Sequence, residues 1–268
     1  MSKMTIETIF YPGRSYGDLR LQALTNELRN AAATCFDSIP NYQALTGDRE
    51  EMKRAIICVA RDEKRNIIGF CSSLVLEVPL YGDVLHTGLT CVTPQARGKK
   101  LTHKLTSKIL VEYLFKESPF SSVWVSNCAC VLSSLGNVAL YFEDVYPSPF
   151  GKKSASKDYL KIAQYISEHY REPIAINNDA IFNPKTFVFE GSVKGAVFEK
   201  DGNDARFFHR NQNLTHYYQD ILNFERGDEV LQIGKVSLMT FPKYLWNTSK
   251  RKSSFLVEQV SGKLIASR

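Results

Sequence analysis

The stretch LTCVTPQARGKKLTHKLTSKIL, which runs from Leu89 to Leu110, decides the fold of this chain. An apolar run ends at Val92, a short polar segment containing Gly98 follows, and a helical pattern of apolar residues begins at Leu101. The pattern predicts a strand, a loop and a helix in direct succession. The unpaired N–H groups and the dipole at the start of such a helix attract anions, and phosphates above all. Gly98 lets a ligand approach the main chain closely.

The loop is basic, because Arg97, Lys99, Lys100 and Lys104 surround Gly98. Cations at the start of a helix oppose the helix dipole, so their presence favours an anion bound between them. The chain contains neither the GxxxxGK[ST] pattern of P-loop proteins nor a GxGxxG dinucleotide fingerprint. The segment therefore predicts an anion site and excludes two common nucleotide-binding motifs.

Periodic patterns on both sides of this stretch predict further elements. In chain order, they are a helix over 19–36, hairpin strands over 55–60 and 67–78, a strand over 83–92, a helix from about 98, a strand over 121–127 and a helix over 132–144. If the strand over 83–92 is regular, His86 and Thr90 lie on the same face of it. The expected fold class is therefore α/β, with helices against a sheet.

The chain changes character after residue 147. Residues 147–156 are rich in Pro, Gly, Ser and Lys and are interpreted as a linker, followed by a helix over 157–170 and strands over 185–200 and 229–241. Residues 206–224 are aromatic and polar without a clean period. We expect the aromatic side chains from Phe207 to Tyr218 to lie in the core, with lining of the acceptor side of a cleft as the alternative. Residues 249–268 are basic and are expected to be partly disordered.

Length and composition exclude several classes of protein. The chain has 268 residues, of which 44% are hydrophobic and 23% charged, so it is neither disordered nor fibrous as a whole. The net charge of +6 fits an anionic ligand without requiring one. The longest uncharged stretch, 118–142, contains too many Ser, Asn and Gly residues for a membrane helix, and the N-terminus lacks the zones of a signal peptide.

The six cysteines form no CxxC pair, and no His spacing completes a zinc site. We expect them to be reduced packing residues, Cys128 and Cys130 included, which is typical of a cytoplasmic protein. No metal is predicted.

The strand–loop–helix segment resembles the pyrophosphate-binding motif of the GNAT superfamily of acyl-CoA N-acyltransferases. Val92-Thr93-Pro94 matches the end of the family's strand, and residues 95–100 (QARGKK) match its Q/R-x-x-G-x-G/A loop except at Lys100, where the family has Gly or Ala. The order of elements over roughly residues 50–147 also matches, including Ala139-Leu140-Tyr141 on a helix. The resemblance implies a mixed, mostly antiparallel sheet with splayed strands flanked by helices, and an enlarged C-terminal part.

The resemblance also implies roles for single residues. Tyr141 occupies the position of the tyrosine that protonates the leaving thiolate, and His86 is the candidate general base, with Glu77, Asp83 or a chain of waters as alternatives. The backbone of Cys91 and Val92 would pair with pantetheine. The loop residues expected to bind the pyrophosphate are Gln95, Ala96, Arg97, Gly98, Lys99 and Lys100. Glu77, Ser126 and Asn127 are the expected substrate-binding residues.

The expected function is transfer of an acetyl group from acetyl-CoA to an amine of unknown size by direct attack. Residues 1–147 would form the acyl-CoA-binding core, and residues 148–268 would complete the sheet and shape the acceptor side. Three alternatives remain: a non-catalytic acyl-CoA-binding or interaction module, a covalent route through Cys128, and nucleic-acid binding. The last is disfavoured because the helix after Gly98 has an apolar stripe to bury and no stacking platform is evident. A membrane is not an expected partner.

Overall fold

Short β-branched runs in the first third of the chain form an antiparallel meander. Its strands are β1 (Thr5–Phe10), β2 (Ala55–Arg61), β3 (Ile67–Val78) and β4 (Gly82–Val92), each paired with the next. The structure is a computed structural model that describes residues 4–151 and 154–239. Every residue of β2 is buried, which fits a central strand covered on both faces.

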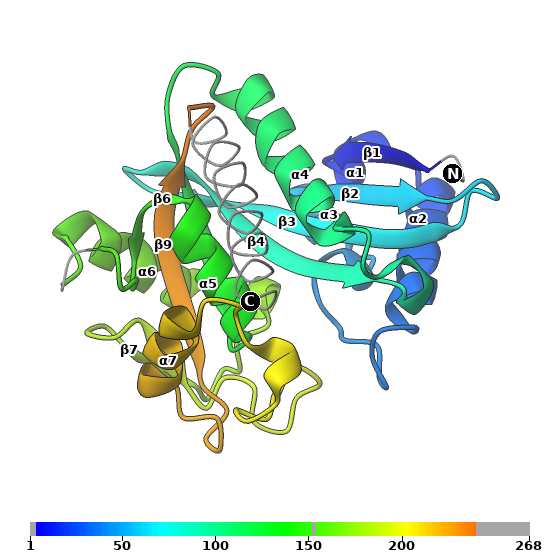
Figure 1. Cartoon of the computed structure of the whole chain (residues 1–268). Coiled ribbons are helices and arrows are strands. Elements are labelled where there is room, and N and C mark those ends of the chain that lie inside the picture. Colours follow the sequence, from blue (N-terminus) through cyan, green and yellow to red (C-terminus); the bar gives the residue numbers. More distant parts are fainter. Residues whose placement is uncertain (1–3, 152–153, 240–268) are drawn as a thin grey trace, which may run out of the picture.

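The sheet continues beyond β4 with strands that are distant in sequence. β5 (Val123–Ala129) is parallel to β4, and β9 (Glu229–Val236) is antiparallel to β5. The far edge of β9 pairs with β6 (Glu143–Tyr146) at one end and with β8 (Val188–Glu190) at the other, and β8 pairs with β7 (Ile181–Asn183). The expected mixed, mostly antiparallel sheet is confirmed (Figure 1).

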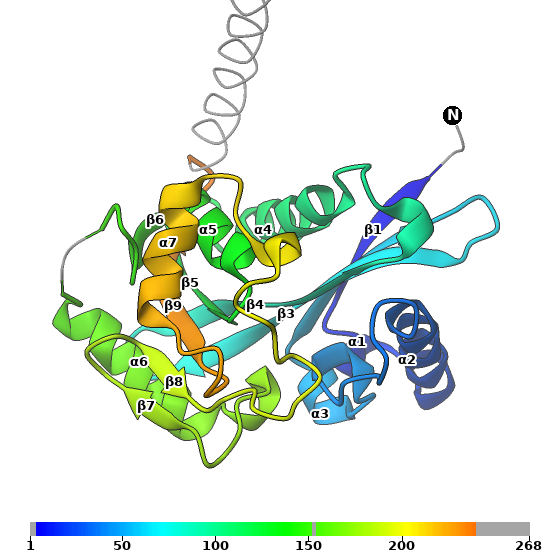
Figure 2. The same cartoon turned by 60° about the horizontal axis from the view of Figure 1, so that its bottom comes forward.

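Helices cover both faces of this sheet (Figures 1 and 2). One face carries α4 (Leu101–Glu117), α5 (Leu132–Tyr141) and α7 (Gln212–Ile221), and the other carries α2 (Asp18–Ala32) and α6 (Lys157–His169). Neighbouring side chains in β9 point to opposite faces of the sheet, which shows that α5 and α6 lie on opposite faces. Gln232 donates to the backbone of α5, whereas Leu231 packs with α6. The short helices are α1 (Pro12–Ser15), α3 (Arg49–Met52) and the 3-10 turns Gln43–Leu45, Pro94–Ala96, Glu172–Ile174 and Ala205–Phe207.

The parallel contact between β4 and β5 is short. It joins Val84–Thr87 to Trp124–Asn127, after which β5 continues to pair with β9 while β4 runs on beside β3 alone. No described strand pairs with the second edge of β4 from Gly88 to Val92. The expected splaying of the sheet is therefore found between β4 and β5.

A β-bulge in β4 lies at the point of separation. Thr87 faces Ser73 and Thr90 faces Cys71, so β4 has one residue more than β3 over this interval. Because an extra residue reverses the alternation, Thr87 and Thr90 share a face and His86 points to the opposite one. The expectation that His86 and Thr90 share a face is wrong for this reason.

Several predicted boundaries in the second half of the chain are also wrong. The helix predicted over 132–144 ends at Tyr141, because the chain turns there to pair as β6 with β9. Of the strand predicted over 185–200, only β8 forms, while the strand predicted over 229–241 begins as expected and ends at Val236. Its last two predicted residues and the basic tail, with Lys250-Arg251-Lys252, lie outside the described residues, as do 152–153 of the linker.

Helix α7 was not predicted, although its spacing is helical. Leu214, Tyr218 and Leu222 recur every four residues and pack on α5 and the start of β9. Tyr218 is fully buried and its hydroxyl donates to the backbone oxygen of Pro147. The expectation that this aromatic side chain belongs to the core is confirmed.

Candidate functional site

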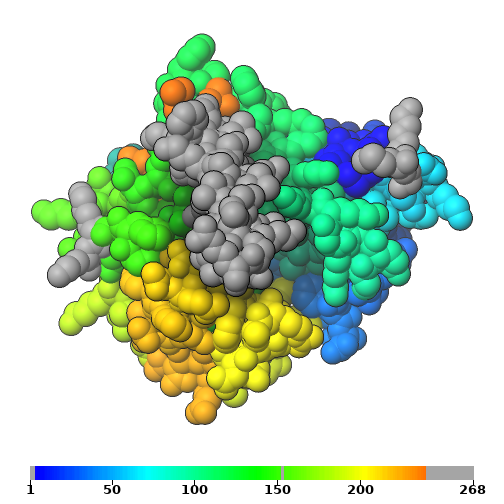
Figure 3. All heavy atoms as spheres, viewed as in Figure 1, coloured from blue at the N-terminus to red at the C-terminus, as the bar shows by residue number. Residues whose placement is uncertain are grey.

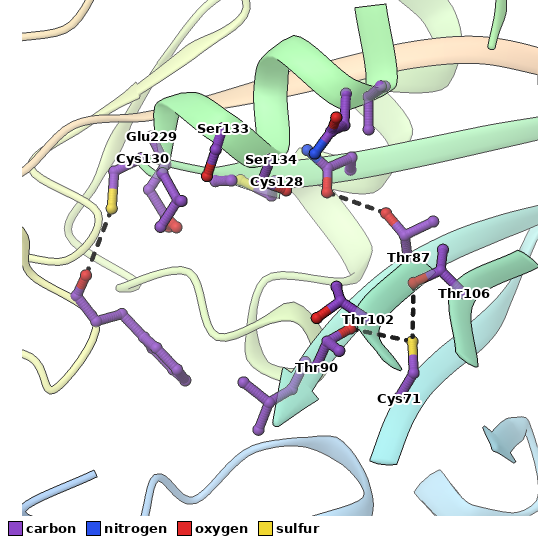
Figure 4. Close-up of a pocket in the computed structure, with 18 of the residues that line it drawn as sticks. Cys71, Thr87, Thr90, Thr102, Thr106, Cys128, Cys130, Ser133, Ser134 and Glu229 are labelled. Carbon is purple, nitrogen blue, oxygen red and sulfur yellow. Dashed lines mark hydrogen bonds between the residues drawn. The ribbon is translucent and has the colours of Figure 1, made fainter. Parts of the chain in front are cut away.

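A cavity of about 470 Å³ lies where β4 and β5 separate. Its walls come from the ends of both strands, from the first turns of α4 and α5, and from the segments around residues 36–42 and 198–207. Because parallel pairing stops at Thr87, the cavity passes through the sheet and has walls on both of its faces. Figure 4 shows part of these walls.

On the face that carries α4 and α5, the cavity is lined by hydroxyl groups. They belong to Thr87, Thr90, Thr102, Thr106, Ser133 and Ser134. Thr90 donates to the sulfur of Cys71 over 3.2 Å, and Thr87 donates to Asn127 Oδ1 over 3.0 Å. Asn127 in turn donates to Gln232 Oε1 over 3.1 Å, so the amide is held from both sides. This half of the cavity can hold a polar, extended ligand by several weak hydrogen bonds.

On the opposite face, the wall is aromatic and contains one carboxylate. The rings of Phe36 and Tyr42 stand edge-on to Phe198, with centroid distances of 6.0 and 5.5 Å. Glu229 precedes Leu231 by two residues in β9 and therefore shares its face, and Leu231 packs with α6, so the Glu229 side chain lies on this second face. Figure 3 shows the segment around residue 200 (yellow) bordering the N-terminal segments (blue), which is how residues so distant in sequence meet here.

Glu229 is an acid in an apolar surrounding. Its side chain is almost fully buried, and one carboxylate oxygen accepts a hydrogen bond of 2.6 Å from the hydroxyl of Ser192. Burial raises the pKa of Glu229 to about 7, although the Ser192 hydrogen bond and the charge of Lys200 both act to lower it. A carboxylate with this pKa can accept and release a proton near neutral pH.

The basic loop lies at the start of α4, beside the cavity. Thr102 and His103 of the first helical turn line the cavity, whereas Gln95, Arg97, Lys99 and Lys100 are exposed and Ala96 is buried. Within the described part of the chain, no side chain caps the start of α4, where the first N–H groups of a helix have no partner inside the helix. Gly98 has a φ of +78° and open space where a Cβ would lie. These features fit the expected anion site.

The structure shows how a lysine fits at position 100, where the family pattern has Gly or Ala. Lys100 is the N-cap residue of α4 and has a φ of +57°, in the left-handed region that glycine adopts readily. Its side chain is exposed, so it does not close the loop. A lysine at this position can therefore be accommodated without filling the loop.

The end of β4 is held from the α2 side. Cys91 is buried, and the thiol of Cys35 donates to the backbone oxygen of Val92 over 3.4 Å. The Nε of Arg97 also lies 3.4 Å from the Val92 oxygen. These contacts fix the strand whose other edge is free.

His86 does not line the cavity. It is fully buried, its Nδ1 lies 2.9 Å from the hydroxyl of Ser126, and burial lowers its pKa to about 3. Ser126 is likewise buried behind the cavity wall, whereas its neighbour Asn127 lines it. Thr87 points to the face opposite His86 because the two are neighbours in the strand, and the bulge that follows brings Thr90 to the face of Thr87 rather than to that of His86. The geometry brings His86 and Ser126 together without bringing either to the cavity.

The two acids weighed as alternative bases are also remote from the cavity. Glu77 and Asp83 face each other at the hairpin end of β3 and β4, and neither lines the cavity. Glu77 is exposed, and its backbone oxygen accepts a hydrogen bond from the Tyr170 hydroxyl.

Tyr141 lies next to the cavity wall. Its ring stands edge-on to His103, with centroids 6.3 Å apart, and its hydroxyl accepts a 3.0 Å hydrogen bond from Arg210. Burial, followed by the charges of Arg210 and Lys100, lowers the pKa of His103, which therefore stays neutral at physiological pH. Tyr141 thus touches a residue that lines the cavity and an arginine from the C-terminal half.

Sequence reasoning missed Glu229, His103 and the aromatic wall. Glu229 could have been found as an acid that opens an apolar strand, since charged residues are seldom buried without a role. Phe207 lines the cavity, so for this residue the alternative to a core position holds. Phe36 and Tyr42 have no sequence signal, because only the fold brings them to residue 198.

Among the described residues, no group of three or more His, Cys, Asp or Glu side chains is arranged to hold a metal ion. The six cysteines are free thiols. None of the helices over residues 4–151 and 154–239 is long and apolar enough to span a membrane.

Comparison with solved structures gives many matches to acetyltransferases. A GNAT family N-acetyltransferase from Escherichia coli in complex with CoA is 18% identical, with 54% of this chain and 71% of that chain covered and a TM-score of 0.38. The resemblance to the GNAT family covers about half of the chain. An aminoglycoside N-acetyltransferase in complex with CoA is 16% identical (44% and 73% covered, TM-score 0.32), and a glucosamine-6-phosphate N-acetyltransferase from Arabidopsis thaliana is 17% identical (52% and 88%, 0.30). No protein-family model and no curated protein sequence matches the chain.

Proposed function

We propose that the protein is an acyl-CoA-dependent N-acyltransferase, which moves an acetyl group from acetyl-CoA to an amine. The observation that carries this proposal is the free edge of β4 beside a cavity that passes through the sheet. Such an arrangement lets one substrate enter along β4 and the other enter from the opposite face. An anion-attracting helix start at the end of the same strand supports a phosphate-bearing donor.

In this proposal, acetyl-CoA lies along β4. The loop residues Gln95 to Lys100 and the first N–H groups of α4 bind its pyrophosphate. The backbone of Cys91 and Val92 pairs with the pantetheine arm as an added strand would, because an unpaired strand edge offers alternating donors and acceptors. The hydroxyls of Thr87, Thr90 and Thr102 surround the acyl end.

Direct attack by the amine is favoured over a covalent route through Cys128. Burial raises the pKa of the Cys128 thiol well above its usual range, and the charge of Glu229 raises it further. A protonated thiol is a poor nucleophile. The amine nitrogen therefore forms the new bond to the acetyl carbonyl carbon, the C–S bond breaks, and the thiolate of CoA leaves with the electron pair.

Tyr141 is the proposed proton donor to this thiolate. Its contact with His103 keeps the ring beside the cavity, and the hydrogen bond from Arg210 stabilises the phenolate that forms after the proton leaves. Asn127 is the proposed polar contact to the acyl group, held by Thr87 and Gln232.

The domain roles follow from the same arrangement. Residues 1–147 form the acyl-CoA-binding part, and residues 148–268 supply β9 and the acceptor side of the cavity through Phe198, Lys200 and Glu229. The identity of the acceptor is addressed below.

Hydrogen exchange measured with and without CoA tests the proposed binding mode. We expect the amides of Gly88–Val92 to exchange more slowly when CoA is present, because the ligand pairs with the free edge of β4. The amides of β2, which are buried between two strands, serve as the internal control and should not change. Unchanged exchange over Gly88–Val92 at saturating CoA would refute pairing along β4.

A further inference from the structure

We propose that Glu229 is the general base of this transfer, and that the acceptor is a primary amine attached to an aromatic or other apolar group. This inference rests on the function proposed above. It starts from the finding that His86, Glu77 and Asp83 lie away from the cavity. Glu229 is the carboxylate that lines the cavity among the described residues.

The position of Glu229 separates it from the proposed donor path. The strand edge of β4 and the threonines of α4 belong to one face of the sheet, whereas Glu229 lies on the other, with Phe36 and Tyr42. An amine that enters from this second face meets the carboxylate before it reaches the gap between β4 and β5. Figure 4 shows Glu229 across the cavity from Thr90 and Thr102.

The hydrogen bonds of Glu229 leave it able to accept a proton. Ser192 donates to Oε2, and among the described residues no donor contacts the other oxygen. Lys200, whose charge favours the carboxylate, donates its own hydrogen bonds to the backbone oxygens of Val197 and Glu199 and lies 5.5 Å from the ring centroid of Phe207. Tyr42, Cys128 and Cys130 also lie within electrostatic reach of Glu229. They are neutral, because burial raises the pKa of each group.

The proton balance of the step is as follows. The Glu229 carboxylate takes one proton from the ammonium form of the acceptor, which frees the nitrogen lone pair for attack. When the C–N bond has formed and the C–S bond breaks, the nitrogen gives its second proton to water. The thiolate takes a proton from Tyr141, and Tyr141 regains one from water, so one proton is released to solvent per amine acetylated. Glu229 returns its proton to water. Because its pKa is about 7, the carboxylate is regenerated at physiological pH.

The aromatic wall limits the class of acceptor. Phe36, Tyr42, Phe198 and Phe207 line the same cavity as Glu229, and the rings of Phe36 and Tyr42 stand edge-on to Phe198. Rings attract an ammonium group electrostatically and bury an apolar body, but they offer few partners to several hydroxyl groups. A polyhydroxylated amine would lose hydrogen bonds to water on entry. The body of an aromatic or aliphatic amine has no hydroxyl groups and so loses no hydrogen bonds to water on entry.

The test is acetyl transfer to two probe amines, followed as thiol release from acetyl-CoA. 2-Phenylethylamine is the apolar probe, and glucosamine is the polar one. We expect kcat/KM to be at least about tenfold higher for 2-phenylethylamine, because a buried ring outweighs hydroxyls that lose their water contacts. With Glu229→Gln, kcat should fall about 10²-fold or more and the rise of activity through about pH 7 should disappear. Glu225→Gln, an exposed acid nearby, is the matched control and should behave as wild type.

The outcomes separate this inference from the proposed function. If CoA binds but 2-phenylethylamine is not acetylated, or glucosamine is preferred, the acceptor class is wrong and acyl-CoA binding stands. If Glu229→Gln keeps the wild-type kcat and pH profile, Glu229 is not the base. If CoA does not bind to the folded wild-type protein, the proposed function itself fails. Phe198→Ala adds a readout that a merely structural role would not move: KM for 2-phenylethylamine should rise about tenfold while CoA affinity stays unchanged.

Discussion

Replacement of Glu229 by Gln is expected to stabilise the folded protein at alkaline pH, although it removes the proposed base. Glu229 is buried with a single hydroxyl donor, so its charged form is disfavoured in the folded state. Gln has the same shape, keeps an oxygen that can accept from Ser192, and carries no charge. A charged side chain that lowers the free energy of unfolding and lines a cavity is typical of a functional site.

The magnitude follows from the pKa. A rise from 4.5 to about 7 corresponds to about 3 kcal/mol at about 1.4 kcal/mol per pH unit. The pKa of Glu229 is higher in the folded state than in the unfolded state. Its contribution to the free energy of unfolding is therefore fully present below about pH 4.5 and is lost as the pH rises to about 7. The gain in the free energy of unfolding of Glu229→Gln over wild type is therefore small at about pH 4.5, grows up to about pH 7 and is constant above it.

Equilibrium urea unfolding of both proteins at pH 5, 6, 7 and 8.5 measures this difference. At pH 8.5 we expect the midpoint of Glu229→Gln to lie about 1 M higher, with an unchanged denaturant slope. Taking the difference between the two proteins cancels the titration of shared groups such as His86. Glu225→Gln should show no pH-dependent difference. A Glu229→Gln variant that is less stable than wild type at pH 8.5 would refute the raised pKa and with it the proton-accepting role.

Three further expectations follow. Tyr141→Phe should lower kcat about 10²-fold in steady-state assays, with CoA affinity unchanged in titration calorimetry, and unchanged kcat would exclude Tyr141 as proton donor. Lys100→Gly should raise the free energy of unfolding by about 1 kcal/mol in urea titrations, because it relieves the left-handed backbone at the start of α4, and a loss of stability would contradict the φ of +57°. The ring signals of His86 should not titrate between pH 5 and 9 in NMR spectra, since its pKa is about 3, and a midpoint near 6.5 would reopen its role as base.

The strand–loop–helix segment could be predicted because every signal in it is local. Val92 ends an apolar strand, Gly98 permits a positive φ and Leu101 begins a periodic helix, so the neighbouring residues suffice. The meander of β1 to β4 is similar, since each of these antiparallel strands pairs with the next in sequence. The outline of the fold follows from these patterns, and the proposed anion site rests on the same local signals.

The residues of the aromatic wall could not be predicted, because their meeting depends on contacts between distant segments. β6 pairs with β9 across an insertion of more than eighty residues, and Phe198 meets Phe36 only when this insertion returns to the sheet. The bulge that separates the faces of His86 and Thr90 also leaves no mark in the sequence, since alternation was counted as if β4 were regular. One extra residue in a strand reverses which residues on either side of it share a face.

Titration calorimetry of the purified protein with acetyl-CoA and with free CoA tests acyl-CoA binding most directly. Gly98→Glu adds bulk and negative charge to the loop, and Gly195→Glu is its matched control, because both glycines have a positive φ and open space beside them. We expect micromolar binding by the wild-type protein and by Gly195→Glu, and loss of binding in Gly98→Glu. Absence of binding to folded wild-type protein, or equal binding by both variants, would contradict a pyrophosphate site at the start of α4.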